Sequence, residues 1–163
     1  MTIEQIKRLL KNLFQQLFSA SNIQTAQSIK LQQITLANLG KDLSPTQNEL
    51  GCVETVCTLL NLTFNNDNLK FLSTAVFYNY LIQSPKFVSV LIPLGGDIVI
   101  SPTGFGNGKM SNGHTGIVLD KGMIASNNSF NSKLEVNYNV GAWRVKYGSV
   151  GGFPVVFFRR CAW

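Results

Sequence analysis

The chain of 163 residues has few charged residues, no internal repeat and no long apolar run. Charged residues make up 13% of it, about half the ~25% usual in globular proteins, so neutral polar side chains must cover much of the surface. The absence of a period excludes collagen, a long coiled coil and a repeat array. Because no stretch of about 18 apolar residues occurs and the first residues do not read as a signal peptide, we expect cytoplasmic synthesis and no stable membrane insertion.

Histidine and cysteine are also scarce, which limits the available chemistry. The chain has one histidine, His114, and three cysteines, Cys52, Cys57 and Cys161. An odd number of cysteines does not make a disulfide framework, and a single histidine without a Cys-x-x-Cys pair argues against a zinc site. We therefore expect no metal and no cofactor, and we consider a cysteine as a nucleophile instead.

The net charge of +6, with an isoelectric point near 9.4, favours an anionic partner. Nucleic acid, an acidic membrane and an acidic cell-wall polymer all fit this charge. The basic residues form no dense block, so we expect no nucleic acid-binding arm. Apolar residues over 3–19 recur every three or four positions, which predicts a helix packed on the domain or, alternatively, one that touches a membrane surface or a partner.

The order of the predicted elements divides the chain after Gly40. Helices over 3–19 and 23–38 form an N-terminal helical hairpin, residues 1–40, closed by Gly40 as a helix stop. Residues 41–163 add two helices, near 51–62 and 67–82, before Val, Ile and Phe runs alternate with glycine and asparagine. The expected strands cover 87–92, 97–101, 114–119, 122–127, 143–147 and 153–159. Helices first and strands afterwards predict an α+β domain with an antiparallel sheet.

Cys52 follows Gly51 at the predicted start of a helix. The free N–H groups and the partial positive charge of a helix N-terminus favour a thiolate, and the small Gly51 would let a substrate approach closely. Cys57 lies inside the same helix among valine and leucine residues, so we interpret it as a core residue. By itself a cysteine at a helix start is weak evidence of catalysis, because buried structural cysteines are common.

His114 opens an apolar predicted strand, and an imidazole has the near-neutral pKa that a general base beside a thiol requires. A hairpin of 114–119 and 122–127 with a two-residue turn places His114 opposite Asn127, which could hold the imidazole in one tautomer. A register shifted by one residue favours Asn128 or Ser126 instead. The alternative interpretations are a structural histidine at a strand start and an asparagine that caps a turn.

Four short segments follow one another in an order that a known family shares. They are Gly51-Cys52-Val53-Glu54, Gly96-Asp97-Ile98-Val99, Gly113-His114-Thr115-Gly116-Ile117-Val118 and Ser126-Asn127-Asn128-Ser129. Over about residues 45–160 this pattern resembles the papain-like cysteine peptidases of the NlpC and CHAP type. The resemblance implies a papain-like fold in which Cys52 is the nucleophile, His114 the base and Asn127 the third catalytic residue.

The chain departs from both subgroups around the nucleophile. NlpC proteins usually read Asp-Cys-Ser-Gly there and many CHAP proteins carry Gln before the cysteine, whereas this chain reads Leu-Gly-Cys-Val-Glu, so the cleaved bond stays open. Gln47 and Asn48 are loose candidates for the oxyanion-hole glutamine of papain-like enzymes. The backbone N–H of Cys52 is the safer donor.

The resemblance implies a bacteriolytic peptidoglycan hydrolase, either a cysteine endopeptidase or an N-acetylmuramoyl-L-alanine amidase. A phage-type endolysin would act at the cell wall, carried by the virion or let through the membrane by a separate permeabilising factor. The alternatives are a non-catalytic wall or virion attachment module of the same fold and a membrane-active protein that works through residues 3–19.

We interpret the glycine-rich residues 102–113 as a mobile loop beside the cleft, and Asp97 as a turn residue.

Overall fold

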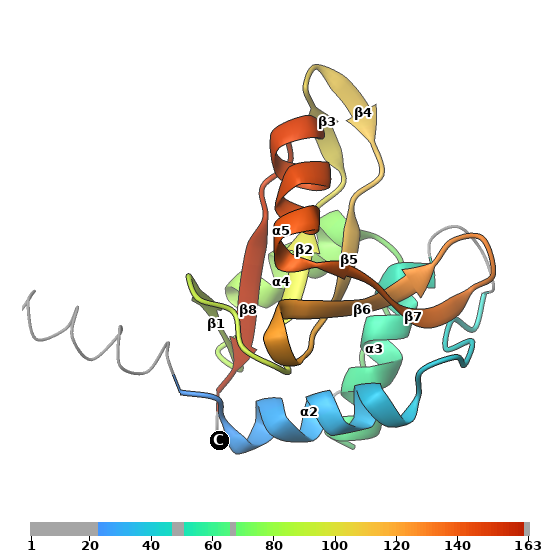
Figure 1. Cartoon of the computed structure of the whole chain (residues 1–163), viewed down its shortest axis with the longest axis vertical. Coiled ribbons are helices and arrows are strands. Elements are labelled where there is room, and N and C mark those ends of the chain that lie inside the picture. Colours follow the sequence, from blue (N-terminus) through green and yellow to red (C-terminus); the bar gives the residue numbers. More distant parts are fainter. Residues whose placement is uncertain (1–22, 47–50, 66–67, 162–163) are drawn as a thin grey trace, which may run out of the picture.

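The computed structural model describes residues 23–46, 51–65 and 68–161, and its helices come first along the chain (Figure 1). These are α2 (Ala26–Ala37), α3 (Gly51–Thr63) and α4 (Thr74–Gln83). The helices predicted over 23–38 and 51–62 are confirmed, and the one predicted over 67–82 begins later, at Thr74. The helix predicted over 3–19 lies outside the described residues, as do Gln47 and Asn48.

Six antiparallel strands form an open sheet in the order β1-β8-β2-β5-β6-β7. Their bounds are β1 (Phe87–Val90), β2 (Ile98–Ser101), β5 (His114–Val118), β6 (Met123–Asn128), β7 (Lys133–Asn139) and β8 (Val156–Arg160). A separate two-stranded hairpin, β3 (Gly104–Gly106) and β4 (Lys109–Ser111), extends from the body in Figure 1. The predicted α+β class with an antiparallel sheet is confirmed.

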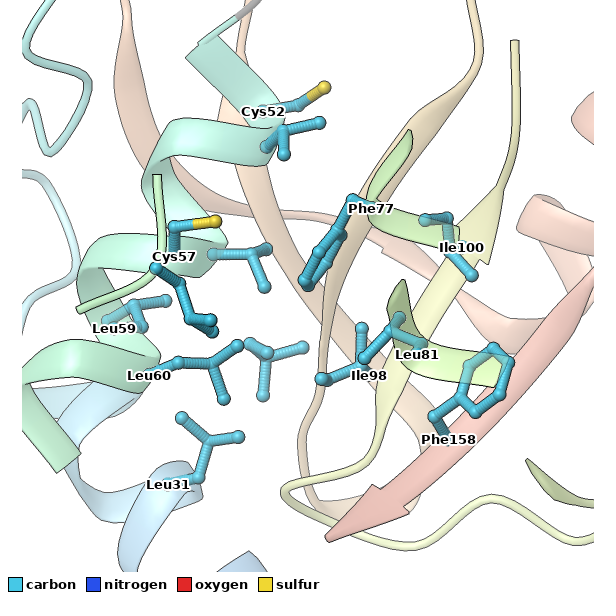
Figure 2. Close-up of a cluster of buried hydrophobic side chains, with 14 of the residues drawn as sticks. Leu31, Cys52, Cys57, Leu59, Leu60, Phe77, Leu81, Ile98, Ile100 and Phe158 are labelled. Atoms are coloured by element: carbon cyan, nitrogen blue, oxygen red, sulfur yellow. The ribbon is translucent and has the colours of Figure 1, made fainter. Parts of the chain in front are cut away.

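Helices pack on both faces of the sheet because the strands are apolar on both sides. Ile117 of β5 belongs to a core shared with α3 and α4, and part of this core is drawn in Figure 2. The next residue, Val118, points to the other face and packs with Trp143 of α5 (Val140–Trp143) and Tyr147 of η2 (Arg144–Val150), a π-helical segment. Alternation along β5 therefore directs successive side chains toward two different helical layers.

Helix α2 is joined to this body by close packing. Its Leu31 is fully buried in the core that α3 also lines. At Gly96, where φ is +82°, an added Cβ would stand 1.9 Å from the carbonyl oxygen of Ser28 in α2. Only glycine permits that approach, so Gly96 has a packing role at the start of β2. The division of the chain after residue 40 stays a prediction.

Asp97 is more than the turn residue predicted from the sequence, because it forms a buried ion pair. Arg159 Nε lies 2.9 Å from Asp97 Oδ1, and Arg159 Nη2 lies 2.7 Å from Oδ2. Arg159 also donates to the carbonyl oxygens of Ile23 and Ile92. The pair therefore ties β8 to the start of β2 and to the segment that enters α2.

The strand predicted over 143–147 is wrong, because these residues continue a helix. Asn139 caps the N-terminus of α5, where its side chain accepts a hydrogen bond from the Ala142 N–H at 2.8 Å. Trp143 and Tyr147 lie four positions apart, a spacing that fits one helical face as well as alternate strand positions. The two aromatic rings bury that face against the sheet.

Two further segments form strands where the sequence patterns predict none. Residues 133–139, for which no strand was predicted, form β7 at one edge of the sheet. The glycine-rich segment predicted as a mobile loop contains the β3–β4 hairpin. Asparagines mark the turn before β7, and Asn107 and Gly108 mark the β3–β4 turn, while the pairing depends on a partner strand that short-range patterns do not identify.

Candidate functional site

A cavity of about 570 Å³ is lined by both Cys52 and His114. Its other lining residues are mostly amides and aromatics: Asn112, Gly113, Asn127, Asn128, Ser129, Phe130, Asn137, Tyr138, Lys146 and Tyr147. The structure thus brings together the three residues predicted as catalytic, Cys52, His114 and Asn127. It does not arrange them as predicted.

Cys52 is the second residue of α3 and is 7% exposed. Its sulfur points away from the labelled leucines of the core cluster, whereas Cys57 lies among them, in agreement with its interpretation as a core residue (Figure 2). Burial raises the pKa of Cys52 to about 11, although backbone hydrogen bonds, foremost from Thr115, oppose the rise. Burial thus outweighs the helix N-terminus, and the resting side chain is a thiol at neutral pH.

His114 lies in a cage of aromatic side chains, on the face of the sheet opposite to the one that α3 covers. Its ring stacks on Trp143 and Tyr147, with centroid distances of 5.3 and 5.8 Å, and meets the edge of Tyr138 at 6.1 Å. Burial and the nearby positive charge of Lys146 lower the pKa of His114 to about 4. The imidazole is therefore neutral at pH 7, which is the form a general base requires.

Cys52 and His114 approach the cavity from the two sides of β5. Thr115, the residue after His114, shares its face with Ile117 and so with the α3 core, and its backbone is a hydrogen-bond partner of the thiol. In the part of the chain that the structure describes, no hydrogen bond joins the thiol to the imidazole. Proton transfer needs a closer approach, and such bonds often tighten only once substrate is bound.

The predicted register of the β5–β6 hairpin is wrong by one residue. The turn contains Asp120–Gly122 rather than two residues, with Lys121 at a φ of 56°, and the ladder pairs Gly116 with Ser126. This register puts Ser126 opposite Gly116, on the same face of the sheet as His114, and the hydrogen bond reaches it diagonally: Ser126 Oγ lies 3.0 Å from His114 Nε2. Ser126 was one of the two alternatives that a shifted register favoured.

Asn137 stands behind Ser126, and a β-bulge puts it there. The β6–β7 ladder pairs Ile124 with Tyr138 and then Ala125 with Val136, so Asn137 is the extra residue of β7. Such a bulge redirects a side chain, and Asn137 Oδ1 lies 2.7 Å from Ser126 Oγ. Asn137 was missed in the sequence because a bulge leaves no local signal.

The hydrogen bonds of Ser126 assign the protons at His114. Asn137 Oδ1 can only accept, so the single hydroxyl proton of Ser126 goes to it. Ser126 Oγ then accepts from His114, which places the ring proton on Nε2 and leaves the lone pair on Nδ1. Asn137 Nδ2 donates to the Ser126 carbonyl oxygen at 3.5 Å, in keeping with this orientation of the amide. Nδ1 is the ring nitrogen available to take a proton.

Asn127 faces α3 instead of the imidazole, contrary to the predicted geometry. The Thr55 hydroxyl donates to its Oδ1 at 3.4 Å, and its Nδ2 lies 2.8 Å from where a Cβ on Gly51 would stand. The absence of a side chain at Gly51 thus makes room for Asn127 and Ser44. The catalytic role of Asn127 stays a prediction, but a role in orienting the base does not fit its contacts.

Lys146 places a positive charge at the cavity. Its Nζ donates to the Tyr138 hydroxyl and lies 4.8 and 5.3 Å from the ring centroids of Tyr138 and Tyr147. None of the described residues that line the cavity is acidic. The cavity therefore favours neutral or anionic groups over cations.

Neither a metal site nor a membrane span is found within the described ranges. No three His, Cys, Asp or Glu side chains of these ranges gather as a group that could hold a metal ion. None of their helices combines the length and the apolar character needed to cross a membrane. No family model matches the chain, and a search of the curated proteins finds no match, so the geometry of Cys52, His114 and their neighbours has to carry the functional assignment.

Proposed function

We propose that the protein is a cysteine hydrolase that cleaves an amide bond in the peptide stem or cross-link of peptidoglycan. The observation that carries this proposal is the shared cavity: Cys52 at the start of α3 and His114 at the start of β5 line it together. The base is neutral and has a free Nδ1, and the nucleophile is a thiol at a helix N-terminus. These are the parts that a general base-assisted thiol attack requires.

In this mechanism His114 Nδ1 takes the Cys52 proton as the sulfur attacks the amide carbonyl carbon. The carbonyl π electrons move to oxygen, and their return breaks the C–N bond while His114 gives its proton to the leaving amine. Water then hydrolyses the thioester, again with His114 as the base. Ser126 and Asn137 keep a proton on Nε2 throughout, both in the neutral ring and in the imidazolium that forms when Nδ1 takes the thiol proton.

A papain-like fold of the NlpC and CHAP type is part of the proposal. Its support is the order of the parts: a helix with the cysteine in its first turn, an antiparallel sheet, a histidine that opens β5 and a polar partner on β6. Peptidoglycan as the substrate rests on that resemblance and on the net charge of +6, which suits an anionic wall. We further propose a phage-type endolysin that reaches the wall with a separate permeabilising factor or in the virion.

One observation favours a second candidate, a non-catalytic wall or virion attachment module. The pKa of Cys52, raised to about 11 by burial, and its separation from His114 describe a resting site without a thiolate. A binding module needs no thiolate and would hold peptidoglycan whether or not Cys52 can react.

The experiment is incubation of the full chain with purified muropeptides, followed by mass spectrometry. Cys52→Ala and His114→Ala should each reduce cleavage below about 0.1% of wild type, because nucleophile and base act as a unit. Cys57→Ala, which removes a thiol of the same helix outside the cavity, is the matched control and should still cleave. Intact muropeptides with wild type, or equal cleavage by Cys52→Ala, would refute the enzyme and leave the attachment module.

A further inference from the structure

Resting on this proposed function, we propose that Asn127 supplies the side-chain donor of the oxyanion hole, through Nδ2, rather than orienting His114. The substrate group it would bind is the carbonyl oxygen of the scissile amide as it becomes negatively charged. The proposal stands on the position of one buried amide beside Cys52 and on the helix end that it faces.

Asn127 is almost entirely enclosed, with 3% of its surface exposed, and yet it lines the cavity together with Cys52. The Thr55 hydroxyl donates a hydrogen bond to its Oδ1. Its Nδ2 is directed at Gly51, the first residue of α3. Among the described residues, no acceptor forms a hydrogen bond with Nδ2. No fully buried side-chain nitrogen of these residues lacks a partner, so Nδ2 keeps some exposed surface, and Asn127 lines the cavity.

The neighbouring helix end completes the site. Helix α3 runs for 13 residues, and its first N–H groups have no partner within the helix. They carry the positive end of the helix dipole, and an oxyanion formed on the Cys52 adduct would lie beside them. An amide donor and a helix N-terminus that converge next to a nucleophile form the arrangement that stabilises a tetrahedral intermediate.

Gly51 has a specific function in this arrangement. A Cβ on residue 51 would stand 2.8 Å from Asn127 Nδ2 and 2.9 Å from the Ser44 side chain, closer than real Cβ atoms approach their neighbours. Alanine there would displace the amide while the thiol and the imidazole themselves stay in the chain. Gly51→Ala therefore perturbs the donor from the opposite side and serves as a second variant.

Kinetics on a soluble muropeptide can separate a donor from an orienting residue. Asn127→Ala should lower kcat about 10²–10³-fold with KM nearly unchanged, because the oxyanion exists only near the transition state. Asn127→Asp should be at least as poor, since a carboxylate repels the oxyanion. Asn131→Ala is the matched control, because that exposed amide donates to Glu135 at 2.8 Å and does not line the cavity, and it should keep near-wild-type kcat.

Two reactions of the thiol supply an independent readout. A peptide aldehyde forms a tetrahedral adduct with an oxyanion, so Asn127→Ala and Gly51→Ala should bind it at least 10-fold more weakly. Iodoacetamide alkylates sulfur with loss of iodide and forms no oxyanion, so the alkylation rate of Cys52 should not change.

The outcomes distinguish the two proposals. Failure of wild type to cleave muropeptides would refute the proposed function. Cleavage by wild type with Asn127→Ala within about threefold of its kcat would refute only the role of Asn127. A parallel fall in the alkylation rate would also overturn that role, because Asn127 would then act on the thiol. Should Asn127→Ala fail to fold, the same comparisons with Gly51→Ala decide.

Discussion

The titration of His114 tests the electrostatics of the site without reference to any substrate. Burial in the aromatic cage and the charge of Lys146 lower its pKa from 6.5 to about 4. The unfolded chain takes up this proton near pH 6.5, whereas the folded chain resists it until about pH 4. The free energy of unfolding should therefore fall as the pH drops through this window.

The size of the effect follows from the two pKa values. The difference between the two pKa values corresponds to about 3 kcal/mol, at about 1.4 kcal/mol per pKa unit. This contribution is fully present above pH 6.5 and is lost progressively as the pH falls to about 4. It is a large share of the roughly 5–15 kcal/mol that stabilises a typical domain.

The assay is direct, because the chain has one histidine and its imidazole gives one set of proton resonances. An NMR titration of a protein without a histidine tag should show a midpoint below about pH 5, and Lys146→Gln should raise it. Urea denaturation at pH 7 and pH 4.5 should then show a smaller loss of stability in His114→Gln than in wild type. A midpoint near pH 6.5, or the same loss in both proteins, would show that the fold does not lower the pKa of His114.

Two further predictions concern hydrogen bonds found only in the structure. Ser126→Ala should lower kcat/KM about 5- to 30-fold, the equivalent of the roughly 1–2 kcal/mol hydrogen bond that holds the imidazole, and should shift the acid limb of the pH–rate profile. Ser126→Thr should recover part of this loss, and an unchanged profile in Ser126→Ala would contradict the assigned tautomer. Arg159→Met should cost about 3–5 kcal/mol in urea denaturation, because it leaves the Asp97 carboxylate buried and unpaired. Lys133→Gln, which removes an exposed charge, is its control, and a cost below about 1 kcal/mol for Arg159→Met would show that the pair does not stabilise the fold.

Elements with strong local signals could be predicted from the sequence. Helix α3 begins where Gly51 and Cys52 precede apolar residues at helical spacing, and β5 begins at His114 before a run of strand-forming residues. The α+β class followed from the same signals, because it depends on the order of the elements and not on their contacts. Cys52 and His114 could be selected because few residues in this chain have the required chemistry.

The contacts between side chains could not be predicted from the sequence in the same way. One additional residue in the turn after β5 put Ser126 instead of Asn127 on the His114 face of β6, where it bonds the imidazole diagonally, and sent Asn127 toward α3. Because the side-chain period of a strand is two, a shift of a single residue exchanges the two faces of the sheet.

By itself, then, the sequence determined the order of the elements, the class of the fold and the residue types that could react. Tertiary structure alone decided the bulge that adds Asn137, the helical state of residues 143–147 and the buried pair of Asp97 with Arg159. It also decided the protonation of the site, with the pKa of Cys52 raised to about 11 and that of His114 lowered to about 4. The physical reason is that each depends on packing between segments distant in the chain, while propensity and periodicity act only between near neighbours.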